Sequence, residues 1–375
     1  MSWLPFGSSR PTELAASGPG RARRTTTAWI TLACAVFFPL VSPPAQRPLD
    51  ASPVPLVSPG QVHTLRSIRG LTPAVVGRFR EPSAFQQASS QQYFVFDRRG
   101  HSVHSVDPDG ASSAMVVTIG GESGRVIAPS AFALAGDGTF VVADTPDRRG
   151  RIQVFGAGGL LRHGFFLPQR SRARITVGGV ALGGVATLAF TGTSLFVNQP
   201  ETGALITEYA LTGAPLRSIG ELRPTGHEDD RVLHLAMNAA IVMVRPGGGF
   251  YTVFVAGSPA FRQYDAQGVL IFERLMQGRE IDALLQTMPR VWPRRVEDGT
   301  EVPLVDPVVK AAAVDAHDQL WVSLAAPVTY VFDRAGEKIR TVQFRAAGVV
   351  SPTSLSFALS GHILVTPGCY EFLLQ

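Results

Sequence analysis

The stretch PSAFALAGDGTFVVADTPDRRGRIQVFGAGG, residues 129–159, decides how this chain is expected to fold. It contains an apolar run, a Gly-Asp-Gly turn at 136–138, a second apolar run that ends at Asp144, a polar loop and a third apolar run before a glycine-rich turn. Runs rich in β-branched and aromatic residues favour strands, and glycine and aspartate between them favour tight turns. The stretch therefore predicts three short antiparallel strands in succession.

The same order of runs and turns recurs along the chain. Comparable segments span residues 82–110, 185–213, 240–268 and 310–336, and a shorter one begins at Pro352. A further apolar run follows each complete segment, at residues 114–119, 160–165, 216–219, 269–274 and 337–344. Units of four short antiparallel strands, repeated at roughly 45 to 55 residues, are typical of β-propeller blades. The pattern predicts an all-β propeller with five complete blades and a sixth that stops after three strands.

The missing strand of the sixth blade is expected ahead of the first blade. The tetrapeptide LRSI ends the third unit at 216–219 and occurs again at 65–68. An open ring leaves the backbone groups of edge strands unpaired, which favours closure. We therefore expect residues 62–68 to pair with residues 369–374, so that an N-terminal strand closes a six-bladed ring over residues 61–375.

The segment 129–159 resembles an NHL repeat, the blade unit of many six-bladed propellers. The residues that carry the resemblance are Pro129, Phe132, Ala133, Asp137, Gly138, Val141, Val142, Ala143, Asp144, Arg151, Ile152, Gln153, Val154 and Phe155. The units from Val185 and Ala240 lack the Asp-Gly turn and the closing aspartate. Over residues 61–375 the resemblance implies a propeller that binds through one face of the disc. It implies no particular chemistry, because one fold hosts unrelated functions.

The N-terminal part of the chain differs in composition from the repeats. The basic segment RARR at 21–24 precedes the apolar run AWITLACAVFFPLV at 28–41, which has the length of a signal-peptide core and is short for a membrane span. Cys34 within it is interpreted as a small apolar residue rather than a lipid-attachment site. We expect residues 1–45 to be a signal peptide or an uncleaved signal anchor, and the proline-rich residues 46–60 to be a linker.

This leader predicts export of the domain to the periplasm or the extracellular space. The membrane is then contacted only through the N-terminal segment, if that segment is retained. The net charge of +5 comes from 34 basic and 29 acidic residues, and no block of five or six like charges occurs, so we expect no nucleic-acid partner. A hydrophobic fraction of 45% against 17% charged residues excludes a disordered chain, and 38 glycines with 28 prolines exclude a helical bundle.

Residues 277–309 interrupt the repeat between the fourth and fifth units. Helical spacing of apolar side chains, ended by a proline, predicts a short amphipathic helix there, carried by Ile281, Leu284, Leu285 and Met288. Insertions in repeat rings often carry function. Trp292, Arg294 and Arg295 are therefore a candidate aromatic and cationic patch for carboxylates or sugar rings. In the alternative interpretation, Trp292 packs the helix onto the blades and both arginines are solvated.

Two further groups of polar residues are candidates for function. His227 and Asp229 belong to the acidic stretch HEDDR at 227–231, which is either a ligand-binding loop or a solvated one. Four residues near the ends of innermost strands are candidates for the mouth of the central channel: His234, Asn238, Asp315 and His317. In a propeller-type hydrolase or lyase such residues would hold calcium or zinc in the channel.

The sequence favours binding over catalysis. Metal, phosphate and nucleophile motifs such as Cys-x-x-Cys, His-Glu-x-x-His and Gly-x-Ser-x-Gly are absent from it. The innermost strands read as mostly apolar or small residues, so we expect no catalytic residues and no bound cofactor or metal. We predict an exported binding or scaffold module whose ligand is a protein, a peptide or a carbohydrate. The alternative is the metal-dependent hydrolase or lyase.

Overall fold

The computed structural model describes residues 61–168, 174–177, 180–183, 185, 187–297 and 300–374. All of these residues belong to one compact unit, Pro55–Gln375. The predictions of a signal segment at 1–45 and a linker at 46–60 therefore lie outside the described residues. Among the residues that are described, no helix has the length and hydrophobicity needed to cross a membrane.

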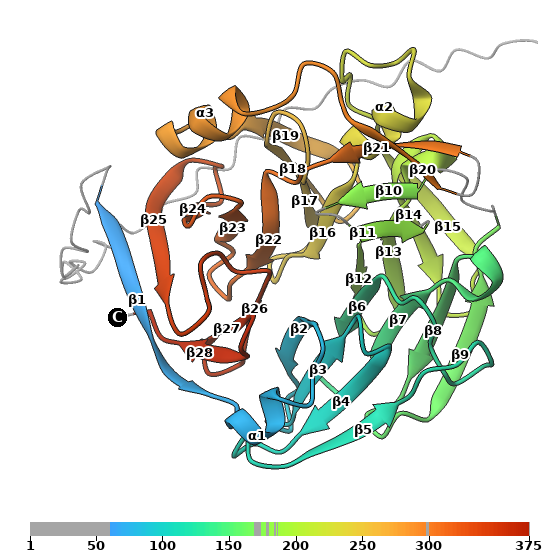
Figure 1. Cartoon of the computed structure of the whole chain (residues 1–375), viewed down its shortest axis with the longest axis vertical. Coiled ribbons are helices and arrows are strands. Elements are labelled where there is room, and N and C mark those ends of the chain that lie inside the picture. The colour runs from blue at the N-terminus through green and yellow to red at the C-terminus, as the bar shows by residue number, and fades with distance from the viewer. Residues whose placement is uncertain are drawn as a thin grey trace, which may run out of the picture. The chain divides into compact units, whose positions relative to one another are not determined.

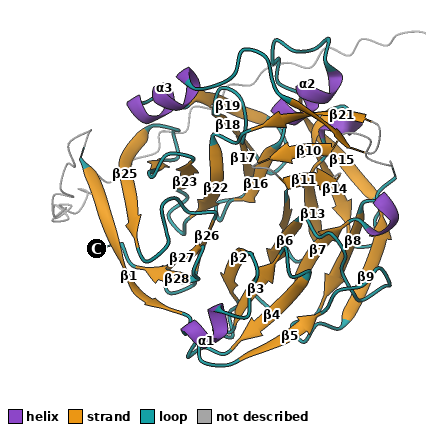
Figure 2. Cartoon of the chain, in the orientation of Figure 1, coloured by secondary structure: helices purple, strands orange, loops and turns teal. Residues whose placement is uncertain are grey.

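Within Pro55–Gln375 the strands form small sheets around a common centre, a propeller-like arrangement (Figure 1; Figure 2). The first sheet contains β2 (Pro82–Gln87), β3 (Tyr93–Asp97), β4 (Ser102–Val106) and β5 (Ser113–Val117). The second contains β6 (Ala131–Leu134), β7 (Phe140–Asp144), β8 (Arg151–Phe155) and β9 (Leu161–Phe166). Each is an antiparallel meander in chain order, as the repeat predicts.

Two later segments of the chain form sheets of the same kind. One contains β12 (Leu188–Phe190), β13 (Ser194–Asn198), β14 (Ala204–Ala210) and β15 (Pro215–Glu221). The other contains β16 (Ala240–Val244), β17 (Phe250–Phe254), β18 (Ala260–Tyr264) and β19 (Leu270–Leu275). The prediction of an all-β fold built from four-stranded repeats is thus confirmed for these parts of the chain.

The remaining repeat strands join in one eight-stranded sheet, in the order β22-β23-β24-β25-β1-β28-β27-β26. Its strands are β1 (Val62–Gly70), β22 (Val309–Val314), β23 (Leu320–Leu324), β24 (Thr329–Phe332), β25 (Lys338–Arg345), β26 (Ser354–Phe357), β27 (Ile363–Thr366) and β28 (Tyr370–Phe372). The first strand of the described chain therefore lies between the two halves of this sheet and belongs to both (Figure 1).

The closing strand pairs differently from the prediction along half of its length. From Ser67 onward β1 pairs antiparallel with β28, as expected, but residues 62–66 pair in parallel with residues 341–345 of β25. β1 has nine residues and β28 only three, so β28 cannot satisfy the whole strand. The outer edge of β25 takes up the rest, because an unpaired edge strand favours any partner within reach.

One further sheet was not expected from the sequence. It has the order β11-β10-β21-β20 and combines β10 (Arg174–Val177) and β11 (Val180–Gly183) with β20 (Arg294–Glu297) and β21 (Thr300–Val305).

The insertion at 277–309 also contains the helix α3 (Arg279–Gln286). A second helix, α2 (Arg231–Met237), precedes β16, and a single turn, α1 (Pro73–Val76), precedes β2. Short 3₁₀ turns follow β7 and β13, at η1 (Pro146–Arg148) and η2 (Pro200–Thr202).

The core lies between successive sheets. Strands such as β3, β7 and β17 are buried along their entire length, which means that both of their faces are covered. Aromatic pairs join neighbouring sheets at ring-centre distances of 5.6 Å for Phe94–Phe140, 5.3 Å for Phe196–Phe250 and 4.8 Å for Phe261–Phe332. Such pairs add to the free energy of apolar burial. They hold the sheets face to face and fix the edge strands at the centre.

Candidate functional site

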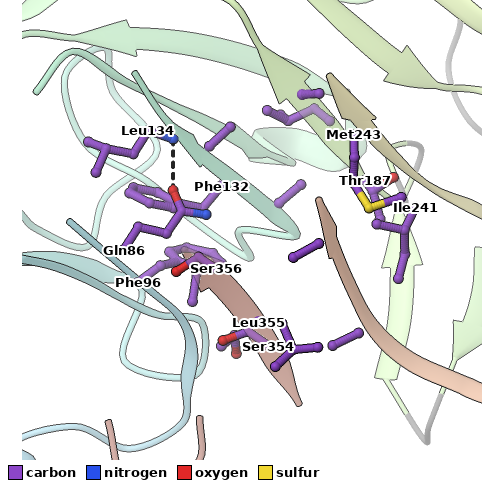
Figure 3. Close-up of a pocket in the computed structure, with 18 of the residues that line it drawn as sticks. Gln86, Phe96, Phe132, Leu134, Thr187, Ile241, Met243, Ser354, Leu355 and Ser356 are labelled. Atoms are coloured by element: carbon purple, nitrogen blue, oxygen red, sulfur yellow. Dashed lines mark hydrogen bonds between the residues drawn. The ribbon is translucent and has the colours of Figure 1, made fainter. Parts of the chain in front are cut away.

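A cavity of about 860 Å³ lies where the innermost strands meet. It is lined by the edge strands of the sheets, namely β2, β6, β12, β16, β22 and β26. Each of these is the terminal strand of its sheet, so one side of its backbone has no neighbouring strand within that sheet. The central cavity is therefore surrounded by strand edges as well as by side chains (Figure 3).

Side chains connect one edge strand to the next around the cavity. Gln86 Oε1 accepts a hydrogen bond from the Leu134 N–H at 3.0 Å, shown as the dashed line in Figure 3. Ser356 Oγ donates to the Phe85 carbonyl at 2.6 Å. These contacts place β26, β2 and β6 side by side with their ends level.

The Thr187 hydroxyl makes the same kind of connection between β12 and β16. Its Oγ1 donates to the Ala240 carbonyl and accepts from the Val242 N–H at 3.3 Å. Thr187 stands just before β12, and Ala240 begins β16, so these strands also start at the same level. The cavity consequently has two ends: a start mouth, where the edge strands begin, and an end mouth, where they finish.

The lining changes in character along the cavity. Apolar side chains dominate it, among them Phe132, Leu188, Phe190, Ile241, Met243 and Leu355. Hydroxyl and amide groups are interspersed: Ser83, Gln86, Gln87, Ser89, Ser130, Thr187, Thr353, Ser354 and Ser356. The charged lining residues are Arg80, Glu81, Arg98 and Lys310, which lie at the start mouth. Glu81 and Arg98 form an ion pair there, and Arg80 and Lys310 are exposed.

Two polar side chains at the ends of second strands, Asp97 and Asn198, fix the backbone at the start mouth. Asp97, at the end of β3, accepts hydrogen bonds from the backbone N–H groups of Arg80 and Glu81, both at 2.8 Å. Asn198, at the end of β13, accepts from the Ala240 N–H at 3.0 Å. The Ser130 hydroxyl, also in the lining, has no hydrogen-bond partner among the described residues. It is therefore a buried polar group whose hydrogen-bonding capacity is unsatisfied in the described part of the chain.

The four channel candidates do not line the central cavity, and the structure separates them into two pairs. His234 and Asn238 lie on or just after α2, ahead of β16, and therefore on the side of the start mouth. Asp315 and His317 follow β22, on the side of the end mouth. The sequence could place all four near strand ends but did not reveal that the edge strands run in the same direction.

Each pair of channel candidates has local partners. His234 Nδ1 lies 2.8 Å from Thr225 Oγ1, and Asn238 is buried with its amide bonded to the N–H and C=O of Arg223 at 2.7 and 3.1 Å. Asp315 accepts from the backbone N–H of His317 at 2.9 Å and from Trp321 Nε1 at 3.0 Å. Within the described part of the chain, no three His, Cys, Asp or Glu side chains are grouped so that they could hold a metal ion.

The residues of the expected aromatic and cationic patch are divided between the interior and the surface. Trp292 is only 8% exposed and packs in the cluster that includes Leu233, Ala236 and Val305. It therefore packs inward, as the alternative interpretation has it, although against α2 instead of α3. Arg294 forms an ion pair with Asp230.

His227 and Trp292 line a second pocket of about 640 Å³, which contains none of Asp229, Arg294 and Arg295. His227 is half-buried and Asp229 is exposed. Of the residues predicted from the sequence, this pocket therefore brings together one from the HEDDR loop and one from the insertion. It shares no lining residue with the central cavity.

The bridging residues Gln86, Thr187 and Ser356 were missed by sequence reasoning. The available signal was a polar residue inside an apolar edge strand, as in PSAFQQ for β2 and SLSF for β26. Such a residue reads equally well as a solvent-facing position. Only the neighbouring strand, supplied from about 50 residues away or from the other end of the chain, shows what it bonds.

No protein-family model, that of the NHL repeat included, matches this chain, and no curated protein matches it either. Among solved structures it is similar to a streptogramin B lyase, with 11% identity, a TM-score of 0.48, and coverage of 77% of this chain and 76% of that one. It is similar to virginiamycin B lyase from Staphylococcus aureus, with 10% identity, a TM-score of 0.46 and 80% coverage of each chain. A protein of unknown function from Bacteroides caccae has 10% identity and a TM-score of 0.46 over 73% of this chain and 85% of that one. Likenesses at this level carry over neither ligand nor activity.

Proposed function

We propose that this chain is a six-bladed β-propeller, exported from the cytoplasm, that binds an apolar peptide segment in its central cavity. The count of six treats the eight-stranded sheet as two blades that share β1. β22 to β25 form one of them, and β26 to β28 with the second half of β1 form the other. The proposed export is supported by the basic and apolar pattern at residues 21–41.

The observation that carries the binding function is the composition of the cavity lining. At about 860 Å³ the cavity has the size of known ligand pockets, and an apolar wall with a few placed polar groups is what such pockets present. Its charged side chains gather at one mouth, so the middle of the cavity offers apolar contact and neutral hydrogen bonds. This favours binding of a neutral, largely apolar segment over acid–base chemistry.

A peptide fits this lining better than a carbohydrate or a folded protein surface. Strand edges around the cavity present N–H and C=O groups, which an extended peptide can pair with through its own backbone. The apolar walls suit side chains such as leucine and phenylalanine, whereas sugar hydroxyls would be buried against carbon. Arg80 and Lys310 at the start mouth favour the carboxylate end of the peptide there.

Methionine methyl groups make this proposal testable, because Met243 lines the central cavity. We would label the methionine methyls with ¹³C and titrate the protein with the tripeptide acetyl-Leu-Phe-Leu, using maltotriose as the carbohydrate comparison. The tripeptide is expected to shift the Met243 methyl signal saturably, and maltotriose is not. A reversed preference would support a carbohydrate ligand instead and overturn the proposal.

A variant at the end mouth tests the location of the site. Val244 is the last residue of β16, lines the cavity and is 37% exposed, so Val244→Arg places a charge in the mouth without disturbing the core. We expect tripeptide binding to weaken about fivefold or more, because the bound peptide would cover the new charge and remove it from water without giving it a partner. The matched control is Val269→Arg, at an exposed position outside the cavity, which should bind as the wild type does. Equal binding by both variants would place the peptide elsewhere.

A further inference from the structure

The second pocket, of about 640 Å³, lies outside the ring of edge strands. Its walls come from the loop around Arg223, the end of α2 at Met237, the outer strand β19, and the segment from Met288 to Trp292 that follows α3. β19 is the last strand of its sheet, so the pocket opens at the opposite edge of that sheet from the central cavity. The two cavities therefore lie at opposite edges of this sheet and share no lining residue.

Arg223 supplies a fixed guanidinium group to this pocket. Its Nη1 and Nη2 donate to the carbonyls of Ser258 and Ala256 at 2.6 and 3.2 Å, and its Cζ lies 4.2 Å from the centre of the Phe254 ring. The backbone of Arg223 is held at both its N–H and its C=O by the Asn238 amide. The side chain is thus oriented before any ligand arrives, which lowers the entropy cost of binding.

The charge on Arg223 is not neutralised by a direct carboxylate bond. Glu273 is the one acid among the lining residues described, and its Oε2 accepts from Arg262 Nε at 2.7 Å. Arg223 has no hydrogen bond to a carboxylate in the described part of the chain, and burial lowers its pKa although Glu273 nearby raises it. Arg290, which is exposed, adds a second cation to the lining. Arg223 is therefore a partly buried cation, and among the described residues no carboxylate forms a direct hydrogen bond with its guanidinium.

The rest of the lining is apolar. Met237, Leu275, Met288, Pro289 and Trp292 surround the space next to the guanidinium. An arginine fork binds a planar carboxylate through two parallel hydrogen bonds, and the flexible methionines adapt to flat or irregular apolar groups. We propose that this second pocket is a binding site for a small carboxylate with an aromatic or aliphatic body, whose carboxylate accepts hydrogen bonds from Arg223.

The test uses one acid and its neutral counterpart of the same shape. 2-Naphthylacetate and 2-naphthylacetamide would be titrated into ¹³C-methyl-methionine protein at increasing concentration. The acid is expected to shift the methyl signals of Met237 and Met288 and to leave Met243 of the central cavity unmoved. We expect the acid to bind about tenfold more tightly than the amide, since a charge-assisted bidentate bond contributes at least this factor.

Two variants separate the charge of the pocket from its shape. Arg223→Gln should remove the preference for the acid, and thermal unfolding would confirm that this variant is folded. Leu275→Glu tests the proposal independently, because Leu275 is 62% exposed and lies at the pocket wall. Loss of the apolar Leu275 side chain affects both probes, but the added carboxylate should weaken the acid about fivefold more than the amide. Arg99→Gln, at an exposed arginine outside both cavities, is the matched control and should change neither.

Four results would overturn the proposal. Equal affinity of the acid and the amide would show that no cation takes part in binding. Shifts at Met243 instead of Met237 and Met288 would place the probe in the central cavity. Failure of both probes to bind at about 10 mM, or full binding of the acid to folded Leu275→Glu, would show that the pocket holds no carboxylate site.

Discussion

Glu371 on β28 accepts two hydrogen bonds from the guanidinium of Arg69 on β1, at 2.9 and 2.8 Å, although the two residues are 302 positions apart in the chain. Tyr93 of β3 donates to the same carboxylate, and His362 Nδ1 lies 3.0 Å from its other oxygen. We call these four residues the closure cluster. It joins the first and last described strands to each other and to the neighbouring sheet.

Replacement of Glu371 should destabilise the fold markedly. Its side chain is 4% exposed, so Glu371→Gln leaves the Arg69 and Tyr93 donors without a charged acceptor. We expect a loss of about 2–4 kcal/mol in the free energy of unfolding, measured by urea denaturation. The control is Glu122→Gln, which breaks an exposed pair with Arg125 and should cost less than about 0.5 kcal/mol. Similar losses in both variants would mean that the closure cluster contributes little.

The contribution of Glu371 should depend on pH. Burial alone raises the pKa of this carboxyl group, but hydrogen bonds from Tyr93, Arg69 and His362 bring the pKa below its ordinary value of 4.5. A group with a depressed pKa in the folded state stabilises the fold above its unfolded-state pKa, and this stabilisation is lost as the pH falls through the folded-state pKa. The wild type should therefore exceed Glu371→Gln in stability at about pH 7, and the difference should shrink below about pH 4.5. A difference that stays constant down to about pH 2.5 would contradict the assignment.

Truncation at the N-terminal side should separate the two pairings of β1. A chain that begins at residue 67 loses the five parallel pairs with β25 and keeps the antiparallel pairs with β28. We expect it to be about 2–4 kcal/mol less stable than a chain that begins at residue 61, as judged by urea denaturation. A chain that begins at residue 71 also lacks Arg69 and should expose two strand edges, which promotes self-association visible in size-exclusion chromatography. Equal stability of all three chains would show that β1 is dispensable.

Gln86 should contribute more to stability than its neighbour Gln87. Gln86→Ala leaves the Leu134 N–H at the cavity wall without its acceptor, at a cost of about 1–3 kcal/mol. Gln87→Ala removes only an exposed bond to the Gln91 carbonyl and should cost less than about 0.5 kcal/mol. Amide hydrogen exchange at Leu134 should accelerate in the first variant only. If both variants exchange alike, the bridge between β2 and β6 does not form in solution.

The repeat and its strands could be predicted because their signals are local. Apolar runs separated by polar or glycine-containing turns within about 30 residues determine each meander, and the resulting strands match the expected runs to within about two residues. The sheet that combines β10 and β11 with β20 and β21 was missed, since its partners lie in separate interruptions of the repeat. The parallel pairing of β1 with β25 was missed for the same reason. The sequence of one strand does not specify which distant strand pairs with it, or in which register.

The candidate sites depended even more on distant neighbours. Trp292 had two interpretations, and the choice between them was made by α2, a helix that the sequence analysis did not predict. Asn238 was a candidate for the channel, yet its amide holds the backbone of Arg223 at the second pocket. Arg223 itself has no motif around it. Its environment is created by the carbonyls of Ala256 and Ser258, more than 30 residues later in the chain.

The two-sided pairing of β1 also bears on the order in which the molecule assembles. On a ribosome the N-terminal side emerges first, so β1 has to wait until β25 and β28 have been synthesised before either partner exists. The intervening meanders are local and can form while translation continues. We therefore expect the pairing of β1 with β25 and β28 to be the last step of folding. A force applied to the two ends of the domain should act on these pairings before it reaches the other sheets.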